Sequence, residues 1–235
     1  MDNADAAKSE FRHVLDDSRR LGLRRLAHNA EAGLAGLGIV VDEPAAQQTK
    51  SVHAPTELGE RLVTVMFADV RGYTALSGGR PPAEMVDLVS TYQRWAAHEI
   101  ERHLGVVDKF AGDAVMATFN ISGNQVDHAA HALRAALALR DKAGVLGLPV
   151  GIGIATGPAM VGTLKTGANL SVVGETTNLA SRLQAQAAAG EVLLSEESYR
   201  RLRDAVVAKS EQLNLKGFDH PVSAYRISAH ATSSA

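Results

Sequence analysis

The sequence predicts an α+β fold of the ferredoxin-like type, with the element order βαββαβ and extra strands at its C-terminal end. Two apolar runs within 104–119 flank the small pair Ala111-Gly112, which is typical of a β-hairpin because glycine adopts turn conformations readily. A strand-like run and a long amphipathic stretch precede this hairpin, and a helix-like stretch and a second strand-like run follow it. Together these observations predict a sandwich of helices packed on an antiparallel sheet.

The elements before the hairpin follow from apolar patterning. The β-branched-rich run 61–68 predicts a buried strand that ends at Asp69. A turn or short helix is expected over 70–79. Pro82 then begins a long helix that reaches about His103, since proline is favoured at the first helical position.

After the hairpin, the chain alternates between helices and strands. Glycines in the strand expected at 150–156 permit close approach of another backbone. Ser195 is expected to cap a helix whose first turn is acidic. The remaining expected elements are helices at 126–142, 175–188 and 195–202, and strands at 170–173, 191–194, 210–216 and 222–227.

The N-terminal part, 1–58, predicts a short helical segment and a linker in front of the main domain, which we expect at 59–228. Residues 11–37 indicate one or two locally basic helices, and 42–58 contain two prolines and little periodicity. The helical segment either docks or dimerises, or it packs on the domain as a peripheral amphipathic helix. The tail, 229–235, is expected to be disordered.

Composition excludes several classes of protein. Hydrophobic content of 46% and charged content of 21% are ordinary for a soluble globular protein, and the net charge of −2 gives no general reason to bind nucleic acid. The absence of cysteine excludes disulfides and thiolate catalysis. The polar, acidic start is unlike a signal peptide, and no apolar run is long enough for a transmembrane segment. We therefore expect a cytoplasmic protein.

The hairpin carries one charged residue on each side of its break. A two-residue turn at Ala111-Gly112 pairs Lys109 with Ala114. Because successive side chains alternate between faces, Lys109 and Asp113 then point to opposite sides. An unpaired buried charge is costly, so the two residues are expected to serve different environments.

Two aspartates, Asp69 and Asp113, each end or begin an apolar strand, and adjacent strands would bring them together. At a separation of about 4 Å and an effective dielectric near 20, their repulsion is about 4 kcal/mol. A divalent cation relieves this repulsion, and oxygen ligands suit Mg²⁺ or Mn²⁺. The alternative is that each aspartate is only a turn residue at a strand end.

Asn178 and Arg182 are four residues apart on an expected helix and share one face. An amide beside a guanidinium suits the stabilisation of a phosphoryl transition state, although a surface ion pair of Arg182 is the simpler alternative. His128 and His131 lack the spacing of a metal site and are expected on a solvated face. Asp108 is expected to be structural.

Together these residues resemble the class III nucleotidyl cyclases, that is, the adenylate and guanylate cyclase catalytic domain. The resemblance extends from about Leu58 to Ile227 and consists of five blocks in the order and spacing of the family. They are FADVRGYTALS, PPAEMVDLVSTYQ, VVDKFAGDAVMATF, GIGIATGPAMVG and VVGETTNLASRLQ. Any single block is a modest signal, whereas the five in order make a specific match.

The resemblance implies a nucleotidyl cyclase sandwich with two divalent cations, Mg²⁺ or Mn²⁺, held by Asp69, Val70 and Asp113. One cation would lower the pKa of the ribose 3′-hydroxyl and the other would anchor the triphosphate. Asn178 would orient the ribose, and Arg182 would stabilise charge on the α-phosphate.

The resemblance also implies substrate contacts. Lys109 matches the purine-reading lysine that favours adenine, whereas Ser171 stands where the family commonly has Asp or Thr. Ala155 and Thr177 also depart from the usual residues, and these departures bear on base selectivity more than on activity. The other implied substrate-binding residues are Gly72, Tyr73, Thr74 and Lys216.

The implied activity is that of an adenylate cyclase, which converts ATP into 3′,5′-cyclic AMP and pyrophosphate. In the family, the metal-binding and the ribose-contacting residues of one site come from opposite subunits, so a head-to-tail homodimer is implied. The alternatives are a guanylate or dual-specificity cyclase, or a weakly active nucleotide-binding regulatory module of the same fold.

Overall fold

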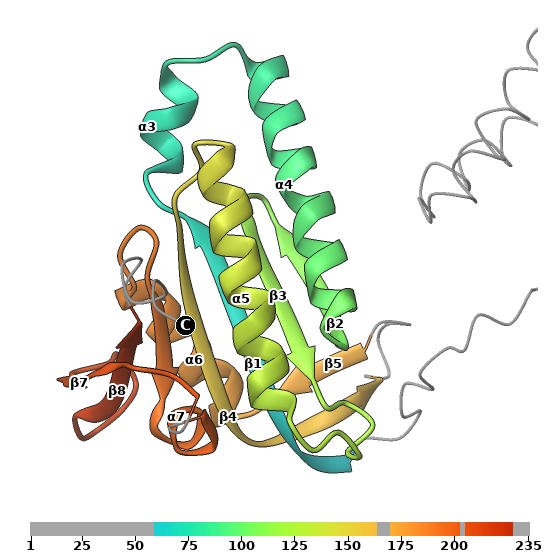
Figure 1. Ribbon diagram of the computed structural model, residues 1–235, viewed down its shortest axis with the longest axis vertical. Coiled ribbons are helices and arrows are strands. Elements are labelled where there is room, and N and C mark those ends of the chain that lie inside the picture. The colour runs from blue at the N-terminus through green and yellow to red at the C-terminus, as the bar shows by residue number, and fades with distance from the viewer. Residues whose placement is uncertain (1–58, 164–169, 203–204, 228–235) are drawn as a thin grey trace, which may run out of the picture. The chain divides into compact units, whose positions relative to one another are not determined.

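The computed structural model describes residues 59–163, 170–202 and 205–227, and it confirms an α+β fold built on one sheet (Figure 1). Seven strands lie side by side in the order β2 (Gly105–Ala111), β3 (Ala114–Phe119), β1 (Gly59–Val70), β4 (Val150–Thr163), β6 (Val192–Ser195), β8 (Val222–Ile227) and β7 (Lys209–Leu213), and β5 (Leu170–Val173) pairs with β4 beside this path. The helices and linker predicted within 1–58 and the tail lie outside the described residues. Among the described helices, none combines the length and the apolar character needed to cross a membrane.

Most of the predicted elements are present, with adjusted ends. The strands are β1 (Gly59–Val70), β2 (Gly105–Ala111), β3 (Ala114–Phe119), β4 (Val150–Thr163), β5 (Leu170–Val173), β6 (Val192–Ser195), β7 (Lys209–Leu213) and β8 (Val222–Ile227). The helices are α3 (Tyr73–Gly78), α4 (Pro82–Arg102), α5 (His128–Val145), α6 (Glu175–Gln186) and α7 (Glu196–Leu202). The Ser195 cap is confirmed, since the backbone N–H of Ser198 donates to Ser195 Oγ at 3.3 Å.

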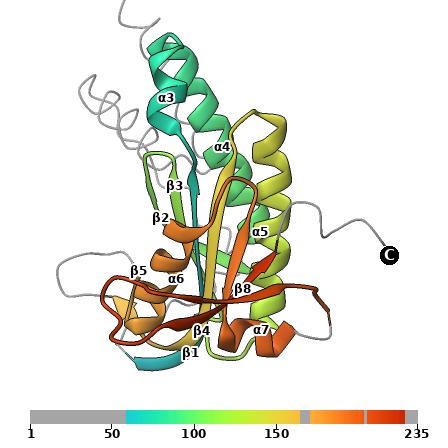
Figure 2. The same cartoon turned by 90° about the vertical axis from the view of Figure 1, so that its left-hand side faces the viewer.

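The sheet is covered on both faces by helices. Helices α4 and α5 pack together on one face, and α6 packs on the other against β1 and β4 (Figures 1 and 2). Strand β1 serves both faces, because its side chains alternate. Met66 belongs to the core beneath α4 and α5, whereas Val65 belongs to the core beneath α6. This placement leaves the C-terminal end of β1 beside α6.

Strand β4 is twice as long as the sequence predicts and pairs with β1 from Gly59–Val161 to Val70–Val150. Its glycines confirm the expected close approach. A Cβ at Gly153 would lie 2.2 Å from the backbone nitrogen of Gln184 and 2.3 Å from the carbonyl oxygen of Ala180. Helix α6 therefore rests directly on the backbone of β4, at a spacing that only glycine permits.

The predicted register of the hairpin is wrong. Ala111 pairs with Ala114, so the two-residue turn is Gly112-Asp113, and a β-bulge at Asp108 places Lys109 opposite Met116. Gly112 has φ 61°, which suits the first central position of a tight hairpin turn. Because Asp113 belongs to the turn and not to a strand, the alternation of side chains along a strand does not place it and Lys109 on opposite faces.

The expectation that His128 lies on a solvated face is also wrong. Its side chain is 2% exposed, and its Nδ1 lies 2.7 Å from Thr64 Oγ1. The hydroxyl of Thr64 lies 2.7 Å from that of Thr156, which in turn lies 2.9 Å from Ser198 Oγ. We call these four residues the buried hydroxyl chain. It joins α5, β1, β4 and α7, elements whose contact cannot be read from local spacing.

Candidate active site

The structure brings Asp69 and Asp113 together, as the sequence predicts. Ala68 pairs with Val115, so the end of β1 lies beside the start of β3. The carboxyl group of Asp113 is within hydrogen-bonding reach of Asp69 and of the backbone N–H of Val70. We call Asp69 and Asp113 the carboxylate pair.

The carboxylate pair is electrostatically strained. Burial raises the pKa of the Asp113 carboxyl, and the neighbouring charge of Asp69 raises it further. Beneath the pair lies Tyr92 of α4, which is fully buried and whose hydroxyl has no hydrogen-bond partner among the described residues. Burial, followed by the charges of Asp69 and Asp113, raises the pKa of Tyr92. A cation would relieve all of these repulsions at once.

The donor set fits a hard divalent cation. Asp69 and Asp113 supply carboxylate oxygens, and the backbone of Val70 lies between them at the end of β1. Within the described ranges, no group of three or more His, Cys, Asp or Glu side chains is placed to hold a metal ion. A cation here would therefore complete its shell with backbone, water or substrate oxygens, which is the habit of Mg²⁺.

Two side chains that the sequence analysis missed contact Asp69. Gln184 Nε2 donates to Asp69 Oδ2 at 3.2 Å, and Arg71 Nη1 lies 3.6 Å from the same oxygen. Gln184 comes from the far end of α6, 115 residues away along the chain. Neither a motif nor a helical spacing points to this contact, so only the tertiary structure reveals it.

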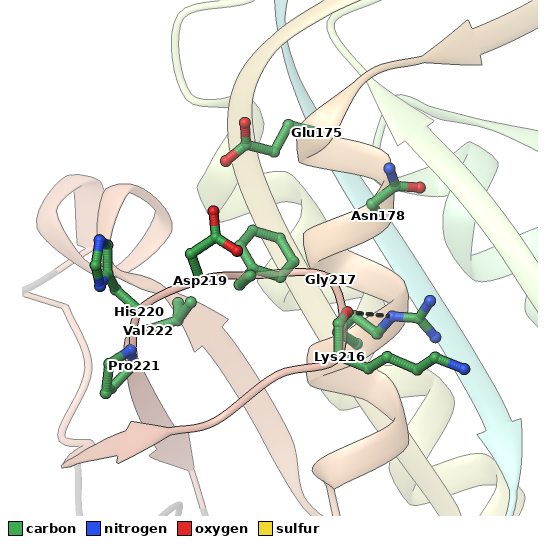
Figure 3. A pocket seen from close by; sticks show the side chains of 10 residues that line it. Glu175, Asn178, Lys216, Gly217, Asp219, His220, Pro221 and Val222 are labelled. Atoms are coloured by element: carbon green, nitrogen blue, oxygen red, sulfur yellow. Dashed lines mark hydrogen bonds between the residues drawn. The ribbon is translucent and has the colours of Figure 1, made fainter.

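Asn178, Arg182 and Lys216 line one cavity of about 510 Å³ between α6 and the loop that joins β7 to β8 (Figure 3). Arg182 Nε donates to the carbonyl oxygen of Lys216 at 3.1 Å, which ties the loop to the helix. All three side chains are exposed. We call this cavity the α6 pocket, and its volume is in the range of small-molecule sites.

The α6 pocket also contains acidic side chains that the sequence analysis did not single out. Glu175 lies in the first turn of α6, and Asp219 and His220 follow Lys216 on the loop (Figure 3). For Asp219 and His220, closeness to Lys216 in the sequence was the available signal. Glu175 and Asp219 moderate the positive charge that Arg182 and Lys216 bring to the cavity.

The other predicted substrate-binding residues lie elsewhere. Lys109 is 65% exposed, and its Nζ lies 3.3 Å from Asp108 Oδ2. Ser171 lies on β5 opposite Gly162, and β5 also contacts β2, the strand of Lys109. Gly72, with φ 71°, precedes α3, which begins with Tyr73 and Thr74.

Within one chain, therefore, the predicted residues form separate groups. The carboxylate pair lies at the joined ends of β1 and β3, whereas Asn178, Arg182 and Lys216 line the α6 pocket, to which neither aspartate contributes. Arg182 and the carboxylate pair therefore do not line the same cavity of the single chain.

Comparison with known proteins identifies one family. The model of the adenylate and guanylate cyclase catalytic domain matches residues 59–229. An adenylate cyclase of Anabaena cylindrica is 31% identical over 188 residues, which cover 72% of this chain and 37% of that enzyme. Adenylate cyclase 1 of Rhizobium meliloti is 36% identical over 134 residues, which cover 52% of this chain and 20% of that enzyme. The chain thus spans well under half the length of these relatives.

Solved structures agree with this result. The adenylyl cyclase CyaB from P. aeruginosa is 32% identical with a TM-score of 0.69, and the match covers 72% of this chain and 95% of that chain. The guanylyl cyclase Cya2 is 28% identical with a TM-score of 0.65, and the match covers 72% of this chain and 92% of that chain. Both adenylyl and guanylyl cyclases are therefore among its structural relatives.

Proposed function

The chain belongs to the family of adenylate and guanylate cyclase catalytic domains, and we propose that it converts ATP into 3′,5′-cyclic AMP and pyrophosphate. The observation that carries this proposal is that one chain carries both residue groups that the reaction needs, namely the carboxylate pair and the side chains that line the α6 pocket. A pair of chains arranged head to tail would join the two groups twice, which gives two composite sites.

The reaction requires that the ribose 3′-oxygen bond to the α-phosphorus while the bond to the pyrophosphate oxygen breaks. Divalent cations bound by Asp69, Val70 and Asp113 would lower the pKa of the 3′-hydroxyl, whose proton leaves to water, and would anchor the triphosphate. Arg182 would stabilise charge that develops on the α-phosphate, and Asn178 would orient the ribose.

Lys216 would hold the terminal phosphates. Its ammonium group is exposed in the α6 pocket, and its carbonyl oxygen accepts a hydrogen bond from Arg182. The positively charged side chains of Lys216 and Arg182 are therefore held on one wall of the cavity. The turn that starts at Gly72 and continues into Tyr73 and Thr74 would face the phosphates from the metal-binding side.

Lys109 is the basis for choosing ATP, since the lysine at this position of the family motif favours adenine. Ser171, the residue expected to work with it, has one short hydroxyl in place of Asp or Thr and therefore discriminates less firmly. A guanylate or dual-specificity cyclase is the alternative that this residue favours.

A second candidate function is a nucleotide-binding regulatory module with little turnover. The observation that favours it is Ser171, which has one short hydroxyl where the family commonly has Asp or Thr. Cyclic nucleotide formation separates the two functions directly.

The test uses the full chain with ATP or GTP and with Mg²⁺ or Mn²⁺, and it measures cyclic AMP, cyclic GMP and pyrophosphate. We expect cyclic AMP to exceed cyclic GMP, and Asp69→Ala to abolish product formation. Formation of cyclic nucleotide that survives Asp69→Ala would overturn the assignment of the metal site. Nucleotide binding without any product would favour the regulatory module.

Mixing two inactive variants tests the composite sites. Random pairing of Asp69→Ala and Arg182→Ala chains makes half of the dimers mixed, and each mixed dimer has one intact site. We therefore expect about a quarter of the wild-type activity to return. A chain that carries both substitutions, mixed with either single variant, is the control and should restore nothing.

A further inference from the structure

Among the described residues, two side-chain donors contact Asp69, and both approach the same oxygen. Gln184 Nε2 and Arg71 Nη1 both lie against Oδ2. We propose that Gln184 and Arg71 are positioning residues that orient this carboxylate so that Oδ1 faces the cation. This inference rests on the proposed function, because it assigns the two residues to the metal site of that reaction.

Arg71 is itself fixed at three points. Its backbone N–H donates to the carbonyl oxygen of Pro149 at 2.7 Å, and its Nη2 donates to the backbone carbonyl of Gln184. Gly151, the residue paired with Asp69 on β4, leaves room for the guanidinium, since a Cβ there would lie 2.3 Å from Arg71 Nε. The guanidinium therefore lies between β4 and α6, where it contacts both elements.

Gln184 is fixed by its helix. The backbone of α6 at Gln184 lies against Gly153, and the side chain of the preceding residue, Leu183, is fully buried. The amide of Gln184 thus projects from a backbone that has little freedom to move. Gln184 is a neutral donor, so it orients the carboxylate without adding positive charge beside the cation. The positive charge of Arg71 lies further from Oδ2, at 3.6 Å compared with 3.2 Å for Gln184 Nε2.

The arrangement joins the two residue groups of one chain. Helix α6 carries Asn178 and Arg182 on the wall of the α6 pocket and carries Gln184 at the carboxylate pair. In the proposed dimer, one helix would therefore support the transition state of one composite site and orient a metal ligand of the other. Substitution of a residue that hydrogen-bonds to a metal ligand typically changes metal affinity or activity by about 10- to 100-fold.

The direct test is binding of Mn²⁺ followed by the electron paramagnetic resonance of the free ion. The full chain is titrated in the presence of 3′-deoxy-ATP, which keeps the triphosphate but lacks the hydroxyl that reacts. We expect Gln184→Leu, which keeps the size of the side chain and removes its donor, to weaken Mn²⁺ binding about tenfold. Arg71→Lys, which keeps the charge and removes the fork, should weaken it less.

Gln186→Leu is the matched control, because Gln186 is exposed near the end of the same helix and lies away from Asp69. Its Mn²⁺ affinity should equal that of the wild type. A purely structural role for Gln184 would lower the thermal midpoint and leave the Mn²⁺ affinity unchanged, which would overturn the proposal. Wild-type protein that binds no Mn²⁺ would overturn the proposed metal site as well.

A mixed dimer gives an independent test. In a dimer of Asp69→Ala and Arg182→Ala chains, the one working site takes its carboxylate pair from the Arg182→Ala chain. Adding Gln184→Leu to that chain should lower kcat at limiting Mn²⁺, and saturating Mn²⁺ should restore most of it. Adding it to the Asp69→Ala chain should have no such metal-dependent effect. Equal effects in both positions would contradict the proposal.

Discussion

The carboxylate pair and the α6 pocket differ in how firmly the fold holds them. Asp69 and Asp113 lie where two core strands end, within reach of Gln184, Arg71 and the buried Tyr92. Asn178, Arg182 and Lys216 are exposed on a cavity wall, and the one hydrogen bond among them joins Arg182 to a carbonyl oxygen.

This difference has a physical reason. A cation needs ligands at fixed short distances, so its site gains from rigid strand ends and from oriented outer contacts. A triphosphate is large and flexible, and long cationic side chains can follow it. In the proposed reaction, one chain would therefore provide a nearly finished metal site and only one wall of a nucleotide site.

The largest effect should come from removing one charge of the carboxylate pair. Asp113→Asn keeps the shape of the side chain but removes a metal ligand's charge, so cyclic AMP formation should fall on the order of 10³-fold, or about 4 kcal/mol. Since the substitution also removes repulsion from Asp69, the thermal midpoint of the metal-free protein should not fall. Retention of a tenth of the activity would contradict the assignment of Asp113 as a metal ligand.

In the α6 pocket, Arg182 and Lys216 should have unequal effects. Arg182→Ala should lower kcat on the order of 10²–10³-fold, because its interaction with the α-phosphate strengthens in the transition state. Lys216→Ala should mainly raise KM for ATP, by about tenfold, since binding to terminal phosphates changes little during the reaction. Steady-state kinetics at saturating Mn²⁺ would measure both, and a KM effect for Arg182→Ala alone would reverse their assigned roles.

Gly153 lies where α6 packs on β4, and α6 carries residues that contact both regions. A Cβ there would meet backbone atoms of α6, which cannot rotate away, so Gly153→Ala should destabilise the protein by about 1–3 kcal/mol. Thermal unfolding would measure this, with Gly79→Ala as control, because Gly79 has φ −105° and nothing within 4 Å of a Cβ. Since α6 serves both regions, kcat and Mn²⁺ affinity should fall together, and a change in only one of them would separate the two regions.

The smallest effect should come from a change of pH. It should act on the free energy of unfolding through His128, which belongs to neither the carboxylate pair nor the α6 pocket. Burial, and to a lesser degree the charge of Arg201, lowers the pKa of His128 below its ordinary value near 6.5. The unfolded chain then binds a proton more readily than the folded protein, so the free energy of unfolding falls as pH drops through about 6.5, by at most about 1.4 kcal/mol per pH unit.

Urea unfolding at pH 7.5 and pH 5.5 would measure this loss, and His128→Gln should reduce it while keeping a polar group beside Thr64. The variant is needed because burial also lowers the pKa of His103 and His131. An equal loss in wild type and variant would show that the buried hydroxyl chain does not respond to protonation of His128.

Patterns of apolar residues predicted most of the fold, because burial of one face imposes a period on each strand and helix. Two local details of the hairpin were not predicted. The hairpin register depended on which residue takes the left-handed conformation at the turn, and Gly112 at its first position was one residue away from the expected placement. The bulge at Asp108 then changed the partner of Lys109, which no alternation rule could anticipate.

Sequence motifs and apolar patterns were enough to predict the family, the α+β fold and the meeting of Asp69 with Asp113, since these depend on motifs and on strands that pair along their length. Only the tertiary structure placed Gln184 and Arg71 on one oxygen of Asp69, buried His128 against Thr64, and separated the carboxylate pair from the α6 pocket. The contacts of Gln184 with Asp69 and of His128 with Thr64 join residues 115 and 64 positions apart in the chain. Contacts at such separations depend on how the helices pack on the sheet, and that packing leaves no period in the sequence.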